Sequence, residues 1–258
     1  MTKLTPFLAA AVLAGSGAVA AQPAPVRNVV IVHGAFADGS GWRGVYDWLT
    51  ARGFKVSIVQ NPLTSFDADV AATNRVLARQ DGPTILVGHS YGGSVITQAG
   101  LSPKVAGLVY VAAFAPDVGQ STLDPYAEVP LPANFVPEEQ PDGFAFLNRD
   151  AFKAGFAGDA SDADAAFLQA SQVPVAMAAL KAKVTAAAWR SKTNSYIVAS
   201  EDGAIDPKLL RSTARRIGAK TSEIKGSHVL FMTQPQAIAD VVADAAQGAV
   251  AQRSKTGE

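Results

Sequence analysis

Apolar residues follow two alternating patterns along this chain, one typical of buried strands and one typical of amphipathic helices. The run from Val26 to Val32 is continuous and β-branched, which predicts a strand buried on both faces. The segment from Ser40 to Arg52 has apolar residues at helical spacing and ends before Gly53, so it predicts a helix. The same patterns predict five further strands, at residues 55–60, 84–87, 105–112, 195–199 and 221–224. They also predict four further helices. One spans residues 67–79 with Asp67 as its N-cap, one follows the strand at 84–87 and runs to Gly100, and two span residues 207–217 and 235–246.

Strands that alternate with helices of this length form a parallel sheet with helices on both faces. We therefore predict an α/β fold with a mainly parallel, six-stranded, doubly wound sheet. Residues 116–190 interrupt the alternation between the fourth and fifth strands: they are rich in proline at first and helical later, and they hold eight of the 20 aromatic residues. So long an insertion predicts a helical lid, or cap, on a core formed by residues 26–115 and 191–250. A small satellite core at the sheet edge is the alternative interpretation.

Composition narrows the chemistry that such a fold could carry. Hydrophobic residues make up 48% of the 258 residues and charged residues 17%, which provides enough apolar side chain for a packed core. The formal net charge is zero, which argues against a nucleic-acid-binding protein, because such proteins need a basic face. The absence of cysteine excludes disulfides, thiolate metal sites and a cysteine nucleophile, and three histidines leave little room for a metal centre. Any catalysis would therefore rest on hydroxyl, carboxylate and imidazole groups.

The first 20 residues have the pattern of a bacterial secretory signal peptide. Lys3 supplies a positive charge, residues 4–20 are apolar and small, and Ala18-Val19-Ala20 is a typical cleavage motif. We predict cleavage near Ala20 and a periplasmic or secreted protein, with an uncleaved membrane anchor as the alternative. No later stretch of the sequence is apolar enough to span a bilayer, so no stable membrane insertion is expected after cleavage.

The segment Gly88-His89-Ser90-Tyr91-Gly92 has the form G-x-S-x-G and lies between a predicted strand and a predicted helix. A sharp turn from strand to helix exposes the serine hydroxyl, and small flanking residues leave room for its strained backbone. The start of the following helix favours negative charge that develops during a reaction. We therefore predict that Ser90 is a nucleophile. A glycine-rich turn with an N-capping serine is the alternative.

A serine hydroxyl is a weak nucleophile and needs a base, for which the chain offers three histidines. His89 lies inside the turn, next to the serine, and cannot easily reach back to it. His33 ends the first strand, where an oxyanion-binding loop would begin. His228 follows the last strand and so lies at the carboxyl end of the sheet, where the sites of open α/β folds form. Elimination and placement both favour His228 as the general base.

The base needs a carboxylate to orient it, and the loop after the strand at 195–199 offers three. Asp206 precedes Pro207 at a predicted helix start, so helix capping explains it better. Glu201 is nearer the strand end, but the shorter side chain of Asp202 suits a position within the loop. We favour Asp202, which gives the chain order serine, acid, histidine.

Acyl transfer also needs two backbone amides that bind the developing oxyanion. One belongs to the residue after the nucleophile, Tyr91, and the other to the loop that begins at His33. Within that loop Ala35 is the preferred donor and Phe36 the close alternative. Phe36 and His89, which flank the predicted site, are expected to contact the substrate.

Together these residues resemble the α/β-hydrolase family. The resemblance lies in VVIVHGAFADGSGW (29–42), ILVGHSYGG (85–93), YIVASEDGAIDP (196–207) and EIKGSHVLFMTQP (223–235), and it is loose in the lid. The subgroup to which the chain is similar contains small carboxylesterases, methyl-salicylate esterases, pyrethroid-hydrolysing esterases and hydroxynitrile lyases. The resemblance implies the α/β-hydrolase fold without its first two strands, Asp202 as the acid, Ala35 as an oxyanion donor, and a reaction that needs no metal and no cofactor.

Lyases of this subgroup typically have Thr at the position of Gly34 and Lys at the position of Val229, so the resemblance implies hydrolysis instead. The expected function is a serine hydrolase that cleaves small, fairly apolar carboxylic esters through an acyl-enzyme at Ser90. Three alternatives remain: a cofactor-free perhydrolase of the haloperoxidase type, a hydroxynitrile lyase-like enzyme, and a non-catalytic ligand-binding protein on the same fold.

Overall fold

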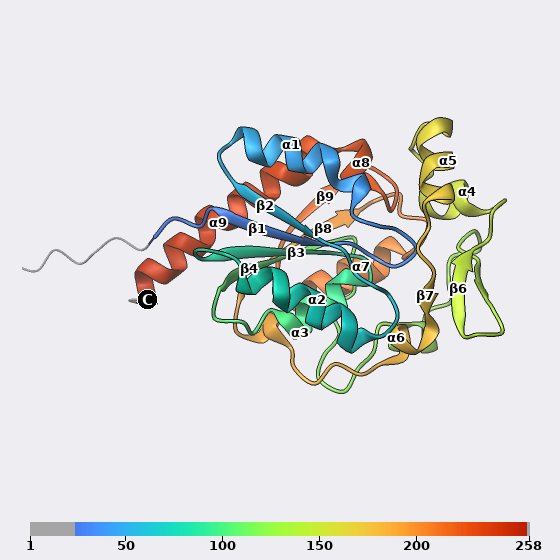
Figure 1. The fold of residues 1–258 in the computed structure, drawn as a ribbon, viewed down its shortest axis with the longest axis horizontal. Coiled ribbons are helices and arrows are strands. Elements are labelled where there is room, and N and C mark those ends of the chain that lie inside the picture. The colour runs from blue at the N-terminus through green and yellow to red at the C-terminus, as the bar shows by residue number, and fades with distance from the viewer. Residues whose placement is uncertain (1–23, 257–258) are drawn as a thin grey trace, which may run out of the picture.

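The computed structural model describes residues 24–256, so the predicted signal peptide lies outside the described residues. Six strands form the central sheet: β1 (Asn28–Val32), β2 (Lys55–Val59), β3 (Thr84–His89), β4 (Val105–Val111), β8 (Thr193–Ala199) and β9 (Lys220–Ile224). Their order is β2-β1-β3-β4-β8-β9, and every neighbouring pair is parallel (Figure 1). The six-stranded parallel sheet of the prediction is confirmed.

The burial of the strands follows their position in the sheet. Every residue of β1 and β3 is buried, whereas the edge strands β2 and β9 are partly exposed. The main helices are α1 (Arg43–Ala51), α2 (Phe66–Ala78), α3 (Gly92–Ala99), α7 (Pro207–Arg216) and α9 (Pro235–Thr256). Helices α1 and α9 pack together on one face of the sheet and α2 and α3 on the other, so both faces of the central strands are covered (Figure 1).

Three helix boundaries differ from the predictions. Residues Ser40–Trp42 form a short 3₁₀ turn before α1. The N-cap of α2 is Ser65, whose hydroxyl accepts from the Ala68 amide at 3.1 Å, so the prediction of Asp67 as the cap was wrong. Helix α9 continues ten residues beyond the predicted end at residue 246, because Ala246 and Ala249 remain buried. None of the described helices is both long and apolar enough to cross a membrane.

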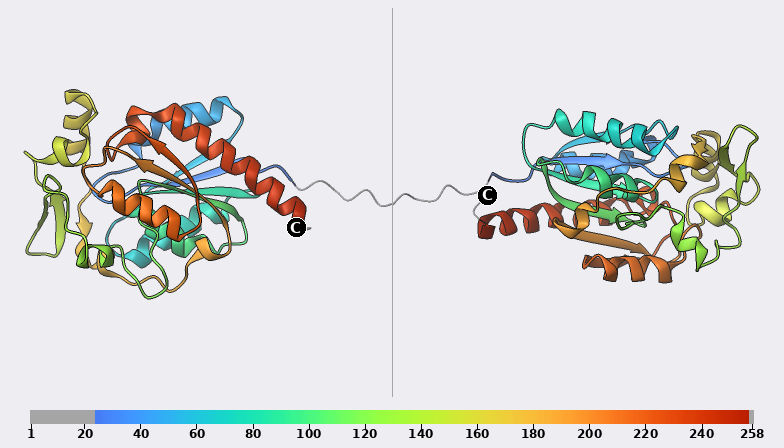
Figure 2. Two further views of the ribbon diagram at one scale, coloured as in Figure 1. Left: turned by 180° about the vertical axis from the view of Figure 1, so that it is seen from behind. Right: turned by 90° about the horizontal axis from the view of Figure 1, so that it is seen from below.

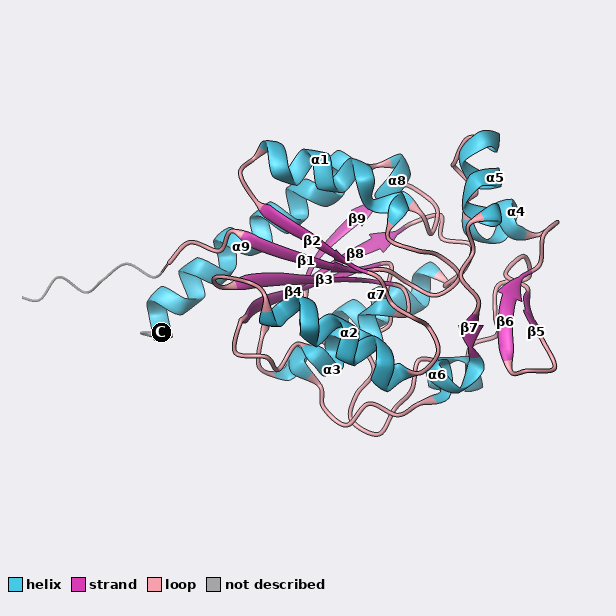
Figure 3. Ribbon diagram, viewed as in Figure 1, coloured by secondary structure: helices cyan, strands magenta, loops and turns pink. Residues whose placement is uncertain are grey.

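The insertion between β4 and β8 stands at the end of the molecule opposite the C-terminus (Figure 2). It contains the predicted helical part as α4 (Phe152–Phe156), α5 (Asp162–Ala170), the short α6 (Met177–Lys181) and two 3₁₀ turns at 124–127 and 188–190. It also contains a three-stranded antiparallel sheet of β5 (Pro137–Glu139), β6 (Phe144–Leu147) and β7 (Val175–Ala176), which the sequence analysis did not anticipate (Figure 3). The Ala176 amide donates to the carbonyl of Leu63 at 2.8 Å, which ties the insertion to the core. We refer to residues 116–190 as the lid.

Candidate active site

Strained backbone marks the carboxyl edge of the central sheet. Phe36, Leu63, Ser90 and Ala112 have φ angles of 61°, 56°, 52° and 43°, in the left-handed region that non-glycine residues avoid. Each of them follows one of the first four strands, β1 to β4. Strain of this kind persists only where the surrounding structure enforces it, and it concentrates at functional sites.

Ser90 occupies the turn between β3 and α3. Its backbone is held on both sides, because its amide donates to the Val111 carbonyl at 3.3 Å and its carbonyl accepts from the Phe114 amide at 3.2 Å. Gly88 and Gly92, which flank the turn, leave no room for a side chain because backbone atoms lie close to both. A Cβ atom on Gly88 would lie 2.6 Å from the Gly92 carbonyl oxygen, and one on Gly92 would lie 2.5 Å from the Val32 carbonyl oxygen. The G-x-S-x-G spacing therefore reflects the tightness of this turn.

The predicted base and acid lie together in the loops after β9 and β8. His228 Nδ1 is 2.8 Å from Asp202 Oδ2, and the two side chains are only 1% and 0% exposed. The other oxygen, Asp202 Oδ1, accepts from the amides of Ala204 and Ile205 at 2.8 and 2.9 Å. Both carboxylate oxygens are thus fixed. Because Nδ1 donates to the carboxylate, the lone pair of the neutral imidazole is on Nε2.

The two other acidic residues of this region have different partners. Glu201 is exposed and forms an ion pair with Lys225 at 3.5 Å. Asp206 accepts from the Lys208 amide at 2.7 Å and caps α7, as expected for a residue before Pro207. Of the three carboxylates in this loop, Asp202 is the one that the structure brings to His228.

His89 is buried against His228 and is not among the described residues that line the cavity in front of Ser90. Its Nε2 donates to the His228 carbonyl at 2.9 Å, and the two rings are 4.5 Å apart between centroids. Burial, with the charge of His228 as a smaller cause, holds the pKa of His89 well below its ordinary value, so the ring is neutral. The contact of His89 with the substrate stays a prediction, since His89 is not among the described residues that line the cavity. Its hydrogen bond instead supports the backbone of the His228 loop.

A third buried histidine fixes the loop after β1. His33 Nδ1 donates to the Gly34 carbonyl at 2.8 Å, and Nε2 accepts from the Asn61 amide at 2.9 Å. Burial lowers the pKa of His33, which keeps the ring neutral and suited to donate at one nitrogen and accept at the other. The Asn61 side chain donates in turn to the His33 carbonyl at 2.9 Å. The sequence pattern did not single out Asn61, which directly follows the strand predicted at residues 55–60.

The cavity in front of Ser90 has a volume of about 190 Å³. The core contributes Ala35, Phe36 and Tyr91 to its wall, three of the residues predicted for the site. The lid contributes apolar side chains that include Tyr126, Leu131, Phe135, Phe156, Met177 and Leu180. None of the described residues that line the cavity is charged. Phe156, which lines the cavity, also packs against His228, with 5.0 Å between the ring centroids.

No hydrogen bond joins Ser90 to His228 within residues 24–256. His89, which precedes Ser90 in the chain, contacts His228, and Phe156, which lines the cavity together with Ser90, packs against His228. Within the same residues there is no cluster of three or more histidine, aspartate or glutamate side chains that could hold a metal ion.

Comparisons with known proteins agree with this architecture. Residues 29–241 match the alpha/beta hydrolase family. The chain is 33% identical over 112 residues to a carbendazim hydrolyzing esterase of Nocardioides sp., which is 38% of this chain and 46% of that protein. It is 31% identical over 113 residues to a pyrethroid hydrolase of Sphingobium wenxiniae, which is 38% of this chain and 40% of that protein. The matched stretches thus span less than half the length of either relative.

Among solved structures, polyneuridine aldehyde esterase superposes with a TM-score of 0.73, over 85% of this chain and 98% of that one. The sequence identity is 21%, so this similarity shows the fold.

Proposed function

The chain belongs to the alpha/beta hydrolase family, and from that premise we propose that it is a serine esterase acting on small, uncharged carboxylic esters. The observation that carries the proposal is the buried His228–Asp202 hydrogen bond, at the same edge of the sheet as Ser90, which lies on a strained turn at an apolar cavity. The names of the two curated relatives, an esterase and a hydrolase, support the same reaction class.

In the proposed first step, Ser90 Oγ attacks the ester carbonyl carbon and His228 Nε2 takes the hydroxyl proton. Asp202 stabilises the imidazolium that forms and holds the ring in the required orientation. The amides of Tyr91 and Ala35 donate to the oxyanion of the tetrahedral intermediate. Serine–histidine hydrogen bonds are often long in free enzymes and shorten in the substrate complex, so we expect the Ser90–His228 bond to form there.

The intermediate collapses when the C–O bond to the alcohol breaks and His228 returns its proton to the leaving oxygen. This leaves an acyl-enzyme on Ser90. Water, deprotonated by His228, then attacks the acyl carbon, and a second tetrahedral intermediate releases the carboxylic acid and restores the serine hydroxyl. Every proton in this sequence is carried by His228, and the ester and one water molecule are the only reactants from outside the chain.

The wall of the cavity supports an uncharged substrate. A charged group placed against these apolar side chains would lose its hydration without gaining a partner. A volume of about 190 Å³ favours a small acyl or alcohol group. Geometry also favours hydrolysis over the lyase reaction, because a Cβ on Gly34 would lie 2.8 Å from the Ser90 Cβ and 2.9 Å from His89 Nδ1. A threonine at this position would displace the serine turn. Export through a signal peptide stays a prediction, since it rests on residues 1–20.

The test compares the wild-type protein with Ser90→Ala on 4-nitrophenyl acetate and butyrate. We expect turnover by the wild type and a loss of roughly 10⁴-fold or more in kcat for the variant, as found when a serine nucleophile is removed. Ser212→Ala is the matched control, because Ser212 is exposed on α7 and bonds only to the Leu209 carbonyl at 2.9 Å. A fluorophosphonate should add one label per chain, at Ser90. Equal turnover by wild type and Ser90→Ala, with no label at Ser90, would refute the proposal.

A further inference from the structure

Asp69 is a buried carboxylate that the proposed reaction does not use. Among the described residues only two acidic residues are buried, Asp202 and Asp69. Asp69 lies in α2, and no lysine, arginine or histidine within residues 24–256 forms a salt bridge with it. A buried carboxylate without a cation is costly, so its hydrogen bonds must account for its position.

Both oxygens of Asp69 accept a hydrogen bond. Oδ2 accepts from the hydroxyl of Tyr91 at 2.6 Å, and Oδ1 accepts from the amide of Leu63 at 2.8 Å. Burial raises the pKa of Asp69 in spite of these two donors. The carboxylate thus joins the residue after the nucleophile to the loop that follows β2.

Leu63 is itself held under strain. It is fully buried, it has a left-handed φ of 56°, and its carbonyl accepts from the Ala176 amide of lid strand β7. A bulky residue adopts this conformation only where its surroundings enforce it. The lid strand, Leu63 and Asp69 therefore form a continuous support behind the Tyr91 hydroxyl.

The side chain of Tyr91 is fixed along its whole length. Its ring packs edge-on against Phe66, with 6.4 Å between centroids, and its hydroxyl bonds to Asp69. Phe66 and Asp69 both belong to the first turn of α2. The backbone of Tyr91 starts α3, and its carbonyl accepts from the Ser94 amide at 2.9 Å.

We propose that Asp69 is a positioning residue, which clamps the Tyr91 hydroxyl so that the Tyr91 amide stays aligned with the oxyanion. This inference rests on the proposed function, because it assigns a purpose to Tyr91 only if an oxyanion forms. Preorganised donors act at about 2.7–3.1 Å from the oxyanion, and small displacements reduce the rate steeply. The clamp acts on the transition state and leaves the binding of the ground-state ester nearly unchanged.

The test uses Tyr91→Phe, Asp69→Asn and the double variant in the full chain, with 4-nitrophenyl acetate as substrate. Tyr91→Phe keeps the ring against Phe66 and removes the hydroxyl, and Asp69→Asn keeps an acceptor for Leu63. We expect kcat to fall about tenfold in each single variant, with KM within about twofold of the wild type. Because both variants break one interaction, the double variant should lose no more than the worse single variant.

Two matched controls separate positioning from general stability. Tyr110→Phe also removes a buried hydroxyl, which bonds to Thr97 at 3.0 Å away from the cavity, and Asp67→Asn makes the same change as Asp69→Asn at an exposed position of α2. Both should retain the wild-type kcat when assayed well below their unfolding temperatures. Wild-type kcat in Tyr91→Phe, or losses that multiply in the double variant, would overturn the inference while ester turnover by the wild type upholds the proposed function. A wild type that turns over no ester would overturn both.

Discussion

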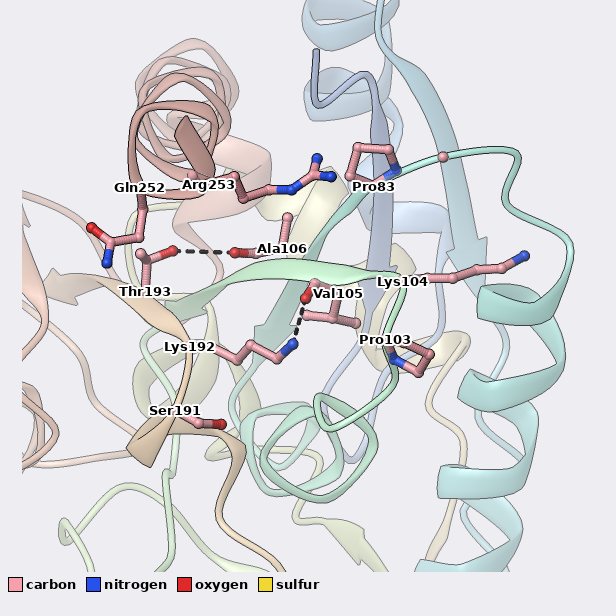
Figure 4. Close-up of a pocket in the computed structure, with 12 residues that line it drawn as sticks. Pro83, Pro103, Lys104, Val105, Ala106, Ser191, Lys192, Thr193, Gln252 and Arg253 are labelled. Atoms are coloured by element: carbon pink, nitrogen blue, oxygen red, sulfur yellow. Dashed lines mark hydrogen bonds between the residues drawn. The ribbon is translucent and has the colours of Figure 1, made fainter. Parts of the chain in front are cut away.

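The two edges of the central sheet differ in how their polar side chains are placed. At the carboxyl edge, His33, His89, His228 and Asp202 are buried, and each has a defined hydrogen-bond partner beside a cavity of about 190 Å³. At the amino edge, a wider groove of about 640 Å³ runs between the starts of β3, β4 and β8 and the end of α9 (Figure 4). Its wall contains three cationic residues, Lys104, Lys192 and Arg253.

Two of the three cations, Lys104 and Lys192, bond to backbone carbonyls of the fold. Lys104 Nζ donates to the carbonyls of Ala78 and Gln80, at the end of α2, at 2.7 and 2.5 Å. Lys192 Nζ donates to the Val105 carbonyl at 2.8 Å (Figure 4). Lysine near the end of a helix satisfies its unpaired carbonyls. The four non-glycine residues of the described chain with left-handed backbone, by contrast, all lie at the carboxyl edge. Strain and buried titratable groups therefore distinguish the candidate site better than the size of the hollow does.

The largest effect should follow from a change to the acid at the carboxyl edge. Asp202→Asn keeps the shape of the side chain but favours the wrong imidazole tautomer, since an amide group can donate to Nδ1. We expect kcat to fall by about 10³- to 10⁴-fold, in line with the same change in other serine triads. Steady-state kinetics with 4-nitrophenyl acetate would measure it.

The control for this change is Glu201→Gln, one residue away. Glu201 is exposed and pairs only with Lys225, so kcat should stay within about twofold of the wild type. The reverse ranking of the two variants would show that Asp202 is not the orienting acid and would remove the main contrast between the two edges.

Two acids, one at each edge, should show different dependence of stability on pH. Burial raises the pKa of Asp69 above its unfolded value near 3.8. The folded protein therefore binds this proton more tightly, so the contribution of Asp69 is fully present below about pH 4 and is lost as pH rises through its folded pKa. At the amino edge, Lys55 lowers the pKa of Asp81, whose contribution is present above about pH 4 and lost at lower pH.

Urea unfolding between about pH 4 and pH 7 would test this difference. The stability of the wild type relative to Asp69→Asn should fall as pH rises. The stability relative to Asp81→Asn should instead rise slightly up to about pH 5, while Asp81 of the unfolded chain finishes ionising, and then stay level. A level difference for Asp69→Asn would mean that the carboxylate is ionised in the folded protein as readily as in the unfolded one.

The inner strands of the central sheet, β1, β3, β4 and β8, were predictable because each contains an apolar run, whereas the edge strand β9 is mostly polar. The lid sheet was not predictable, because β7 has two residues and β5 is the polar sequence Pro-Glu-Glu, so neither shows an alternating pattern. These strands form through pairing with β6, which is a tertiary effect. The cap of α2 was misplaced for a different reason: Ser65 and Asp67 are both good cap residues, and sequence alone does not rank them.

Within the site, Ser90, Asp202 and His228 could be proposed because each follows a strand that the sequence shows clearly. Asp69 could not be proposed by that argument, since it lies within a helix, where acids usually face solvent. A signal was nevertheless present. The buried residues of α2 are Phe66, Asp69, Thr73 and Leu77, so Asp69 lies in phase with the apolar stripe. A charged residue in phase with the apolar stripe of a helix therefore indicates a buried charge, as it does at Asp69.

The smallest effect should follow from a change at the amino edge. Lys104→Met keeps the aliphatic stem and removes the two hydrogen bonds to the end of α2, which should cost about 1 kcal/mol of stability. For a chain of this size that corresponds to a fall of roughly 2–4 °C in Tm, measurable by circular dichroism. Ester turnover should be unchanged, because the groove lies at the opposite edge from Ser90. A loss of turnover with an unaltered Tm would instead give the groove a part in the reaction, and the contrast between the two edges would fail.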